Sequence, residues 1–158
     1  MIYTLHVQSG MEWNALAKLR GQGIKAYAPK KNMLLRRKGE WKYEQSYLFP
    51  GYIFIDVKLT DDIYYTAKNT AGVIRFLGDP TPLSCSEQKR LQWIFDSELI
   101  GISRGVVKDG ELIITEGLLK GKESQIVSWS IRQKRCKLRC EINGRPHTYF
   151  VSAEITRA

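Results

Sequence analysis

Charged and apolar side chains alternate along the stretch from Arg135 to Ile142, and the charged residues are basic except for Glu141. Alternate residues of a strand share a face, so Arg135, Lys137 and Arg139 should point outward together. Neighbours on that face lie about 7 Å apart, two strand rises of ~3.3–3.4 Å, which is close to the spacing of phosphates along an extended nucleic-acid backbone. Three further basic residues extend the stripe, Arg132, Lys134 and Arg145. The pattern predicts a polyanion-binding face; a basic face that serves only solubility is the alternative.

A second basic stretch runs from residue 30 to residue 42. It carries six lysines and arginines against one acid, Glu40, which gives a net charge of +5. Gly39 near its middle predicts the tip of a β-hairpin. Trp41 and Tyr43 in the second arm could stack on a nucleic-acid base, although packing on the sheet explains them at least as well. We therefore expect this hairpin to contact nucleic acid less specifically than the stripe at residues 132–139.

Three aromatic residues surround the dipeptide Pro50-Gly51: Phe49 precedes it, and Tyr52 and Phe54 follow. Aromatic residues at this spacing usually belong to a hydrophobic core. A bulge at Pro50-Gly51 could instead turn Phe49 and Tyr52 toward solvent. In that case they would form a docking surface for another protein.

Residues that could support catalysis form no recognisable motif. Residues 117–123 resemble a phosphate-binding loop only faintly, because three residues separate the glycines and Glu123 stands where serine or threonine is needed. The cysteines, Cys85, Cys136 and Cys140, lack the paired spacing of a zinc site, and neither histidine stands in such a pair. We therefore expect no enzyme activity, no metal and no cofactor, and reduced thiols typical of a cytoplasmic protein.

The chain as a whole is basic and of ordinary globular composition. Its 158 residues carry 25 lysines and arginines against 16 acids, a formal net charge of +9, and 43% are hydrophobic. A small basic chain favours a polyanionic partner such as nucleic acid. The longest apolar run, residues 47–55, is interrupted by Pro50-Gly51, and the first residues lack the basic and apolar regions of a secretory signal. We expect neither a membrane partner nor export.

The segments that must position these residues suggest two folding domains and an α+β fold class. Residues 1–98 alternate short strands with three helices, which predicts an α/β sandwich with helices against a sheet. Within it, residues 52–57 read as a central strand and residues 61–69 as a helix. Two S-x-x-E motifs, Ser9–Glu12 and Ser84–Glu87, are typical of helix N-termini.

The second domain is predicted to be built of strands alone. Glycines across residues 99–110 predict a linker. Residues 111–158 contain only short strand-like segments, with Asn143-Gly144 as a strong hairpin signal. They predict a small β-barrel of four or five strands.

Several stretches resemble the NusG family of transcription elongation factors, along nearly the whole chain. Residues 49–53, FPGYI, are similar to the FPGYV stretch of the family. Residues 72–78, GVIRFLG, precede Pro82-Leu83-Ser84 as they do in the family. In the second half, residues 117–121 resemble the glycine loop of KOW domains, and residues 142–145, INGR, resemble the IFGR turn. Each match alone is weak, but together they are specific.

The resemblance implies a fold and a function. It implies an NGN-type domain, an antiparallel sheet flanked by helices, in residues 1–98, and an SH3-like KOW domain in residues 111–158. In the family the first domain docks on the clamp helices of the β′ subunit of bacterial RNA polymerase, reaches toward the β subunit and suppresses pausing. By position, His6, Phe49 and Tyr52 would line the clamp-binding pocket. Polar residues that contact the β subunit in specialised relatives correspond to Tyr64, Tyr65 and Thr66. Such a factor acts as a monomer, by binding alone.

Two departures from the family pattern narrow the expectation. The aromatic of the IFGR turn, which in the general factor helps to dock Rho or a ribosomal protein, is Asn143 here, and the second glycine of the KOW loop is Ser124. Together with the basic strand, these departures favour a specialised paralogue similar to the LoaP antiterminators, whose KOW domain recognises a hairpin in leader RNA. Three alternatives stay open: a general NusG-like factor, an RfaH-like factor recruited by DNA or a protein partner, and a stand-alone KOW protein that binds RNA or DNA without polymerase.

Overall fold

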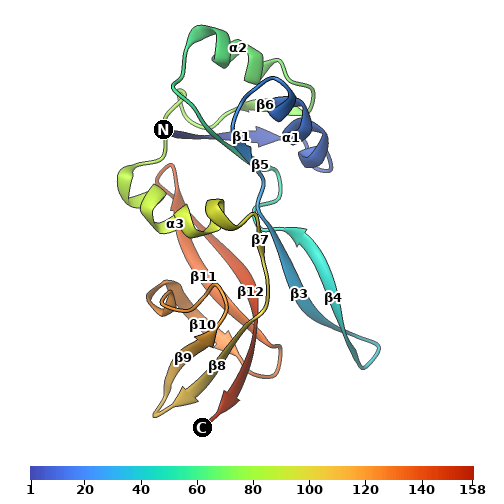
Figure 1. Cartoon of the computed structure of the whole chain (residues 1–158), viewed down its shortest axis with the longest axis vertical. Helices are drawn as coiled ribbons and strands as arrows, with labels where there is room; N and C mark the ends of the chain where they lie inside the picture. Colours follow the sequence, from blue (N-terminus) through green and yellow to red (C-terminus); the bar gives the residue numbers. More distant parts are fainter. The chain divides into compact units, whose positions relative to one another are not determined.

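The computed structural model describes all residues, 1–158, and shows a mixed α/β protein with three α-helices and three β-sheets (Figure 1). Its residues group into two compact units. Unit 1 comprises Met1–Ala28, Phe49–Phe95 and Glu141–Arg145; unit 2 comprises Pro29–Leu48, Asp96–Cys140 and Pro146–Ala158. The hairpin expected at residues 30–42 belongs to unit 2, and the short segment Glu141–Arg145 belongs to unit 1.

The elements follow one another along the chain as labelled in Figure 1. The α-helices are α1 Glu12–Gly21, α2 Asp61–Lys68 and α3 Cys85–Ser97, and a 3₁₀ turn, η1, covers Glu123–Gln125. The first six strands are β1 Ile2–Val7, β2 Ala26–Tyr27, β3 Lys30–Arg37, β4 Glu40–Tyr47, β5 Tyr52–Asp56 and β6 Val73–Phe76. The last six are β7 Leu99–Ile100, β8 Ser103–Lys108, β9 Glu111–Glu116, β10 Ile126–Ser130, β11 Arg135–Ile142 and β12 Arg145–Arg157.

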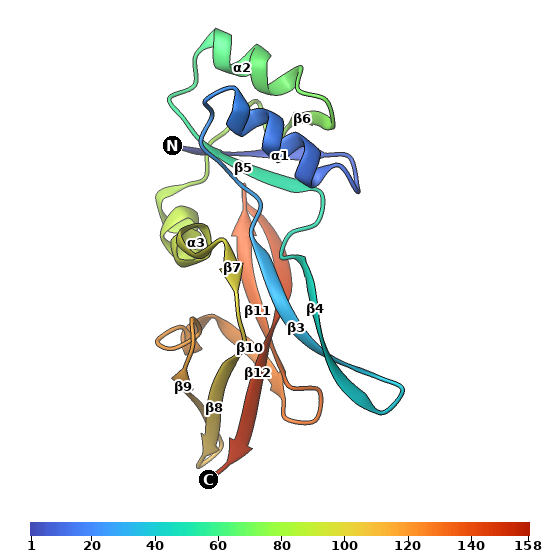
Figure 2. The same cartoon turned by 45° about the vertical axis from the view of Figure 1, so that its right-hand side comes forward.

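The sheet of unit 1 has the strand order β2-β5-β1-β6. β5 pairs antiparallel with β1 on one side and β2 on the other, which confirms the prediction of a central strand that begins at Tyr52. Helices α1 and α2 pack on one face of this sheet (Figure 2). There Leu19 and Ala67 join Leu5 and Ile55 in a core that solvent does not reach.

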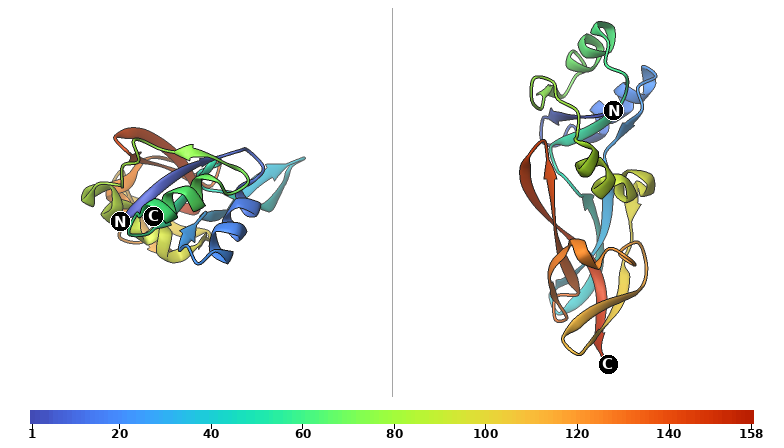
Figure 3. Two further views of the ribbon diagram at one scale, coloured as in Figure 1. Left: turned by 90° about the horizontal axis from the view of Figure 1, so that it is seen from above. Right: turned by 90° about the vertical axis from the view of Figure 1, so that its left-hand side faces the viewer.

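Helix α3 lies against the other face of the same sheet, which two further views show (Figure 3). Strand side chains alternate between faces, so Phe54 points away from its neighbours Ile53 and Ile55. Its ring lies 4.9 Å from the ring of Phe95 on α3, and neither side chain is more than 2% exposed. Unit 1 is therefore a sheet between helices, as residues 1–98 predict.

Helix α3 begins as its S-x-x-E motif predicts. The Glu87 backbone N–H donates to the Ser84 hydroxyl (3.2 Å), and the Ser84 N–H donates to the Glu87 carboxylate (2.8 Å). This reciprocal pair satisfies two donors that a helix terminus otherwise leaves without partners. Helix α2 also begins at the predicted residue, Asp61, where the Thr60 hydroxyl accepts a hydrogen bond from the Ile63 N–H (3.3 Å).

The first S-x-x-E motif does not cap a helix, and that prediction was wrong. Helix α1 begins at Glu12 after Met11, and no side chain caps it. The Glu12 carboxylate is buried and instead accepts a hydrogen bond from the backbone N–H of Gly51 (3.2 Å). A contact distant in sequence thus uses the carboxylate that the local motif would need.

The larger sheet of unit 2 has five strands in the order β10-β11-β12-β8-β9. Four of them lie within residues 111–158, where four or five were predicted, and the fifth, β8, lies in the expected linker. β8 and β12 run parallel, and β8 and β9 antiparallel. Burial alternates along β11: Cys136, Leu138 and Cys140 are at most 2% exposed, whereas the basic residues between them are half-buried or exposed. The predicted alternation of this strand is therefore confirmed.

The basic hairpin forms a second sheet of unit 2, with the order β4-β3-β7. Its arms pair from Lys30–Tyr47 to Arg37–Glu40. Lys38 and Gly39, with φ values of +51° and +81°, make the two-residue turn between the arms. Positive φ at both positions matches the twist of a hairpin, so the predicted tip at Gly39 is confirmed.

Residues 99–110, expected to be a linker, contain strands β7 and β8. The glycines suggested flexibility, but Gly105 has a packing reason. A Cβ atom at this position would lie 2.8 Å from the Ile113 carbonyl oxygen on β9. Gly105 therefore permits the close approach of two paired strands rather than a loose connection.

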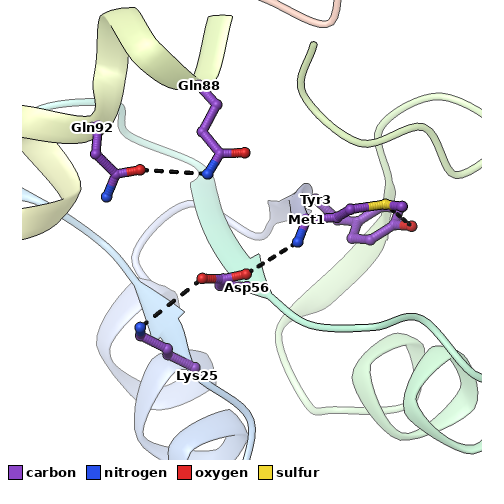
Figure 4. A network of polar contacts seen from close by, with 6 residues as sticks. All are labelled: Met1, Tyr3, Lys25, Asp56, Gln88 and Gln92. Atoms are coloured by element: carbon purple, nitrogen blue, oxygen red, sulfur yellow. Dashed lines mark hydrogen bonds and ion pairs between the residues drawn. The ribbon is translucent and has the colours of Figure 1, made fainter. Parts of the chain in front are cut away.

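The ion pairs at Asp56 contribute little to the stability of unit 1. The Asp56 carboxylate on β5 lies 3.3 Å from the Met1 ammonium and 3.9 Å from the Lys25 ammonium (Figure 4). Both cations are about two-thirds exposed, and surface pairs of this kind stabilise by roughly 0–1 kcal/mol. No helix of the protein is long and apolar enough to cross a membrane.

Candidate functional site

His6 and Tyr52 lie side by side on the central strands of unit 1. They are paired in register between β1 and β5, and their ring centroids are 5.9 Å apart. Both side chains are half-buried and present part of each ring to solvent. Gly51, with φ +83°, turns the chain just before β5, and its carbonyl accepts a hydrogen bond from the Val7 N–H (2.8 Å). The turn at Pro50-Gly51 thus fixes Tyr52 beside His6.

Phe49 lies in the hydrophobic core and does not turn toward solvent, the other arrangement that its sequence context allows. It is 5% exposed, and its ring lies 5.7 Å from the ring of Phe54. Its carbonyl accepts a hydrogen bond from the Tyr52 N–H (3.1 Å). In this structure Phe49 supports Tyr52 through the backbone, while His6 and Tyr52 remain partly accessible to solvent.

The three expected contact residues on α2 differ in exposure. Tyr64 is half-buried, and its ring stacks on Phe76 with centroids 5.1 Å apart. Thr66 is half-buried, and its carbonyl accepts a hydrogen bond from the Thr70 hydroxyl (2.8 Å). Tyr65 is 58% exposed and is the one member of the three with a large solvent-facing ring.

The basic face of β11 carries Arg135, Lys137 and Arg139 on the outside of the five-stranded sheet. The guanidinium of Arg135 lies over the Phe150 ring, 4.6 Å from its centroid, and Arg135 donates to the Gln133 side chain (3.1 Å). On the neighbouring strand β10, serines stand opposite Lys137 and Arg135. Lys137 and Arg135 therefore face uncharged residues on β10, whereas Glu141 follows Arg139 on the same face of β11.

The remaining basic candidates divide between the units. Arg132 is exposed, and Lys134 places its ammonium over the Trp41 ring, 4.6 Å from the centroid, both within unit 2. Arg145 is exposed and belongs to unit 1. The structure therefore gathers five of the six predicted residues in one unit. The contact between Trp41 and Lys134 has no local sequence signal, because 93 positions separate the two residues.

The turn at Asn143-Gly144 makes contacts in unit 1 that the sequence did not indicate. The Asn143 side-chain amide donates to the Thr81 carbonyl (2.8 Å), and the Gly144 N–H donates to the Glu87 carboxylate (2.8 Å). Glu87 thus serves two purposes, since its other oxygen caps α3. From the sequence, the S-x-x-E motif predicted only the local capping role of Glu87 and not its contact with Gly144.

The thiols and acids of the protein do not form a metal centre. No group of three or more His, Cys, Asp and Glu side chains is placed to hold an ion. Cys85 is exposed, whereas Cys136 and Cys140 are buried, and burial raises the pKa of the Cys136 thiol to about 11. A thiol in that state is a poor nucleophile and a poor metal ligand.

The chain matches one family of known proteins over more than half of its length. The model of the family described as "Transcription termination factor nusG" matches residues 2–92, more than half of the chain. The chain belongs to the NusG family. Members of this family are transcription termination and antitermination factors.

Named relatives match over different lengths. A transcription termination/antitermination protein NusG of Chlamydia pneumoniae is 36% identical over 70 residues, which cover 44% of this chain and 38% of that protein. The corresponding protein of Streptococcus pyogenes serotype M3 is 25% identical over 128 residues, which cover 77% of this chain and 70% of that protein. The match to the chlamydial relatives thus spans little more than a third of their length.

The fold has a solved counterpart in NusG of Thermotoga maritima, a structure described as domain interaction in that protein. The two share 17% sequence identity and a TM-score of 0.56, over 96% of this chain and 92% of the other. At this identity the likeness shows the fold alone.

Proposed function

We propose that this NusG-family protein is an antitermination factor that holds RNA polymerase with one domain and a leader RNA hairpin with the other. The polymerase-binding part is an NGN-type domain in residues 1–98, and the RNA-binding part is an SH3-like KOW domain in residues 111–158. The observation that carries the proposal is the β11 face, on which Arg135, Lys137 and Arg139 share one side of the strand and serines of β10 stand opposite Arg135 and Lys137. The resemblance to the LoaP group supports RNA, rather than a protein partner, as the ligand of this face.

The proposed polymerase contact rests on aromatic side chains. His6 and Tyr52 form a ring pair that is fixed by strand pairing and partly open to solvent. Tyrosines held in this way lose little conformational freedom on binding and are enriched among residues that dominate interface energies. Phe49 would hold Tyr52 in place from the core without touching polymerase itself. On α2, Tyr65 would make the main contact, and the half-buried Tyr64 and Thr66 would hold it in position.

Two weak contacts on one chain would reinforce one another. Once the KOW domain holds a hairpin in nascent RNA, the first domain stays near the polymerase that made it, which raises its effective concentration. This arrangement would confine the factor to transcripts that carry the hairpin. The mechanism requires binding alone and no cofactor.

A purified transcription assay tests the proposal. The template carries the protein's own upstream leader followed by an intrinsic terminator, and the measured quantity is the fraction of transcripts that pass the terminator. We expect read-through to rise with wild-type protein and to fall with the double variant Lys137→Ala/Arg139→Ala. A matched variant, Lys108→Ala/Lys120→Ala, removes two exposed charges away from β11 and should act as wild type. Saturating wild-type protein that leaves read-through unchanged would refute antitermination.

Separate variants test the polymerase contact. His6→Ala and Tyr52→Ala should weaken binding to RNA polymerase, whereas Tyr43→Ala, which removes an aromatic that is 72% exposed on the hairpin, should not. If polymerase binding survives both of the first two changes, the aromatic contact is refuted. RNA binding without any polymerase binding would instead support a stand-alone nucleic-acid-binding protein.

A further inference from the structure

Unit 2 contains a pocket between the basic hairpin and the turn that joins β10 to β11. Its volume is about 230 Å³. Arg36 and Trp41 of the hairpin line one side, and Arg132, Gln133 and Arg135 line the other. Two leucines of β3 complete the lining. Three arginines and an indole around one small cavity are an unusual combination for a merely solvated surface.

Two hydrogen bonds hold strand β3 of the hairpin, which lines the pocket, against β12. The Leu34 N–H donates to the buried Ser152 hydroxyl (2.8 Å). The Lys31 ammonium donates to the Phe150 carbonyl (2.7 Å). Strand β3 of the basic hairpin is therefore anchored to β12.

The positive charge of the pocket is not neutralised. None of its lining residues is acidic. On the hairpin, Glu44 pairs with Arg37 (3.1 Å), whose side chain lies on the opposite face of β3 from that of Arg36. Burial lowers the pKa of Lys31, and the charge of Arg135 lowers that pKa further. An anion would relieve this repulsion.

Lys134 shows a second unusual feature beside the pocket. It has φ +53°, in the left-handed region that a lysine seldom adopts, and its carbonyl accepts a hydrogen bond from the Ala153 N–H (3.0 Å). Its ammonium lies 4.6 Å from the centroid of the half-buried Trp41 ring. Strained residues of this kind persist where the surrounding structure enforces them, often at binding sites. Here the turn places the Lys134 ammonium beside Trp41, which lines the pocket.

We propose that this pocket binds one unpaired nucleotide of a nucleic acid, with the base against Trp41 and the phosphate between Arg36 and Arg132. The volume is below the roughly 300–1,000 Å³ typical of sites for drug-sized ligands, and suits a single base and its phosphate. A base paired within a duplex could not enter, whereas an extruded or single-stranded base stacks readily on an aromatic ring. The inference rests on the proposed RNA binding by β11 and extends that face through Arg135, which belongs to both.

Binding of two labelled probes to the full chain tests the pocket. The probes are a 12-nucleotide oligouridine and a blunt RNA duplex of the same length, measured by fluorescence anisotropy. Trp41→Ala should weaken oligouridine binding about 5- to 150-fold, the effect of losing one stacked base. Duplex binding should change less than about 2-fold, and Trp41→Phe should restore most of the single-strand affinity.

Matched variants separate the pocket from general charge and from the β11 face. Tyr43→Ala removes an exposed aromatic two residues along the same strand and should have no effect on either probe. Because the two arginines would hold one phosphate, Arg36→Ala/Arg132→Ala should flatten the slope of log affinity against log salt for oligouridine by about 0.7. The same double variant should weaken oligouridine binding more than Lys38→Ala/Lys42→Ala does. Equal losses for Trp41→Ala and Tyr43→Ala, or equal losses on single strand and duplex, would overturn the pocket. If Lys137→Ala/Arg139→Ala changes the binding of neither probe, RNA binding by the β11 face is refuted, whereas nucleotide binding in the pocket is not.

A third probe, oligodeoxyuridine, tests whether the pocket distinguishes ribose from deoxyribose. Oligodeoxyuridine bound as tightly as oligouridine, with the same dependence on Trp41, supports a nucleotide site that does not distinguish RNA from DNA. Weaker binding of the deoxy probe supports a site selective for RNA. Failure of all probes to bind the wild-type chain at low salt would overturn both the pocket and the proposed RNA binding.

Discussion

Removal of two charges from the β11 face should change the salt dependence of RNA binding by a calculable amount. Lys137 and Arg139 are half-buried and exposed, respectively, on the outer side of the strand. If each neutralises one phosphate, the slope of log affinity against log salt should flatten by roughly 0.7 per charge for single-stranded RNA and 0.9 for duplex. The double variant Lys137→Ala/Arg139→Ala should therefore flatten the slope by about 1.4–1.8.

This change of slope has a direct consequence for affinity. Between 50 and 200 mM salt the concentration rises fourfold, so wild-type protein should lose roughly 7- to 12-fold more affinity than the double variant over that range. The assay is a titration of a labelled leader hairpin at five salt concentrations, followed by anisotropy. Because the two substitutions lie on the outer face, circular dichroism and the unfolding midpoint should stay close to wild type.

The control and the refuting result follow from the same geometry. Lys108→Ala/Lys120→Ala removes two exposed charges elsewhere in unit 2 and should leave the slope within experimental error of wild type. Two double variants with the same slope change would mean that net charge, not the β11 face, governs binding. An unchanged slope in Lys137→Ala/Arg139→Ala would show that the face does not contact phosphates.

Three further predictions concern stability and thiol chemistry. Iodoacetamide at pH 8 should add one label to the native protein, at exposed Cys85, and mass spectrometry should find Cys136 unlabelled because burial raises its pKa to about 11. Ser84→Ala should reduce the free energy of unfolding by about 0.5–2 kcal/mol in urea, since the capping hydrogen bond of α3 is lost, and no change would contradict the cap. Gly105→Ala should cost about 1–3 kcal/mol because its Cβ would meet a carbonyl oxygen of β9 at 2.8 Å, whereas Gly101→Ala, with no atom within 4 Å, should be well tolerated.

Features fixed by neighbouring residues could be predicted from the sequence. The alternation of β11, the turn at Asn143-Gly144 and the cap of α3 depend on residues a few positions apart, and the structure confirms all three. Each is a local rule about strand period, positive φ or helix termini. The same is true of the hairpin tip at Gly39.

Features that depend on contacts between residues distant in sequence could not be predicted from local sequence rules. Glu12 looked like the second half of a capping box, yet its carboxylate bonds to Gly51, 39 positions away. Gly105 looked like part of a linker, yet it permits two strands to approach. The exposed and core readings of Phe49 could not be separated until the position of Phe54 was known. In each case the residue type was informative, but its partner was not adjacent in sequence.

Asn143 shows how a departure from a family pattern can have more than one cause. The resemblance to NusG factors suggests that replacing an aromatic here removes a docking residue for a protein partner. The structure adds a local reason: Asn143 has φ +52°, which asparagine tolerates better than most residues, and its amide donates to the Thr81 carbonyl (2.8 Å). A phenylalanine would lose this hydrogen bond and be strained at that φ. This local contact gives a second reason for asparagine here, so the argument for a specialised RNA-binding paralogue rests more on the charges of β11 than on this turn.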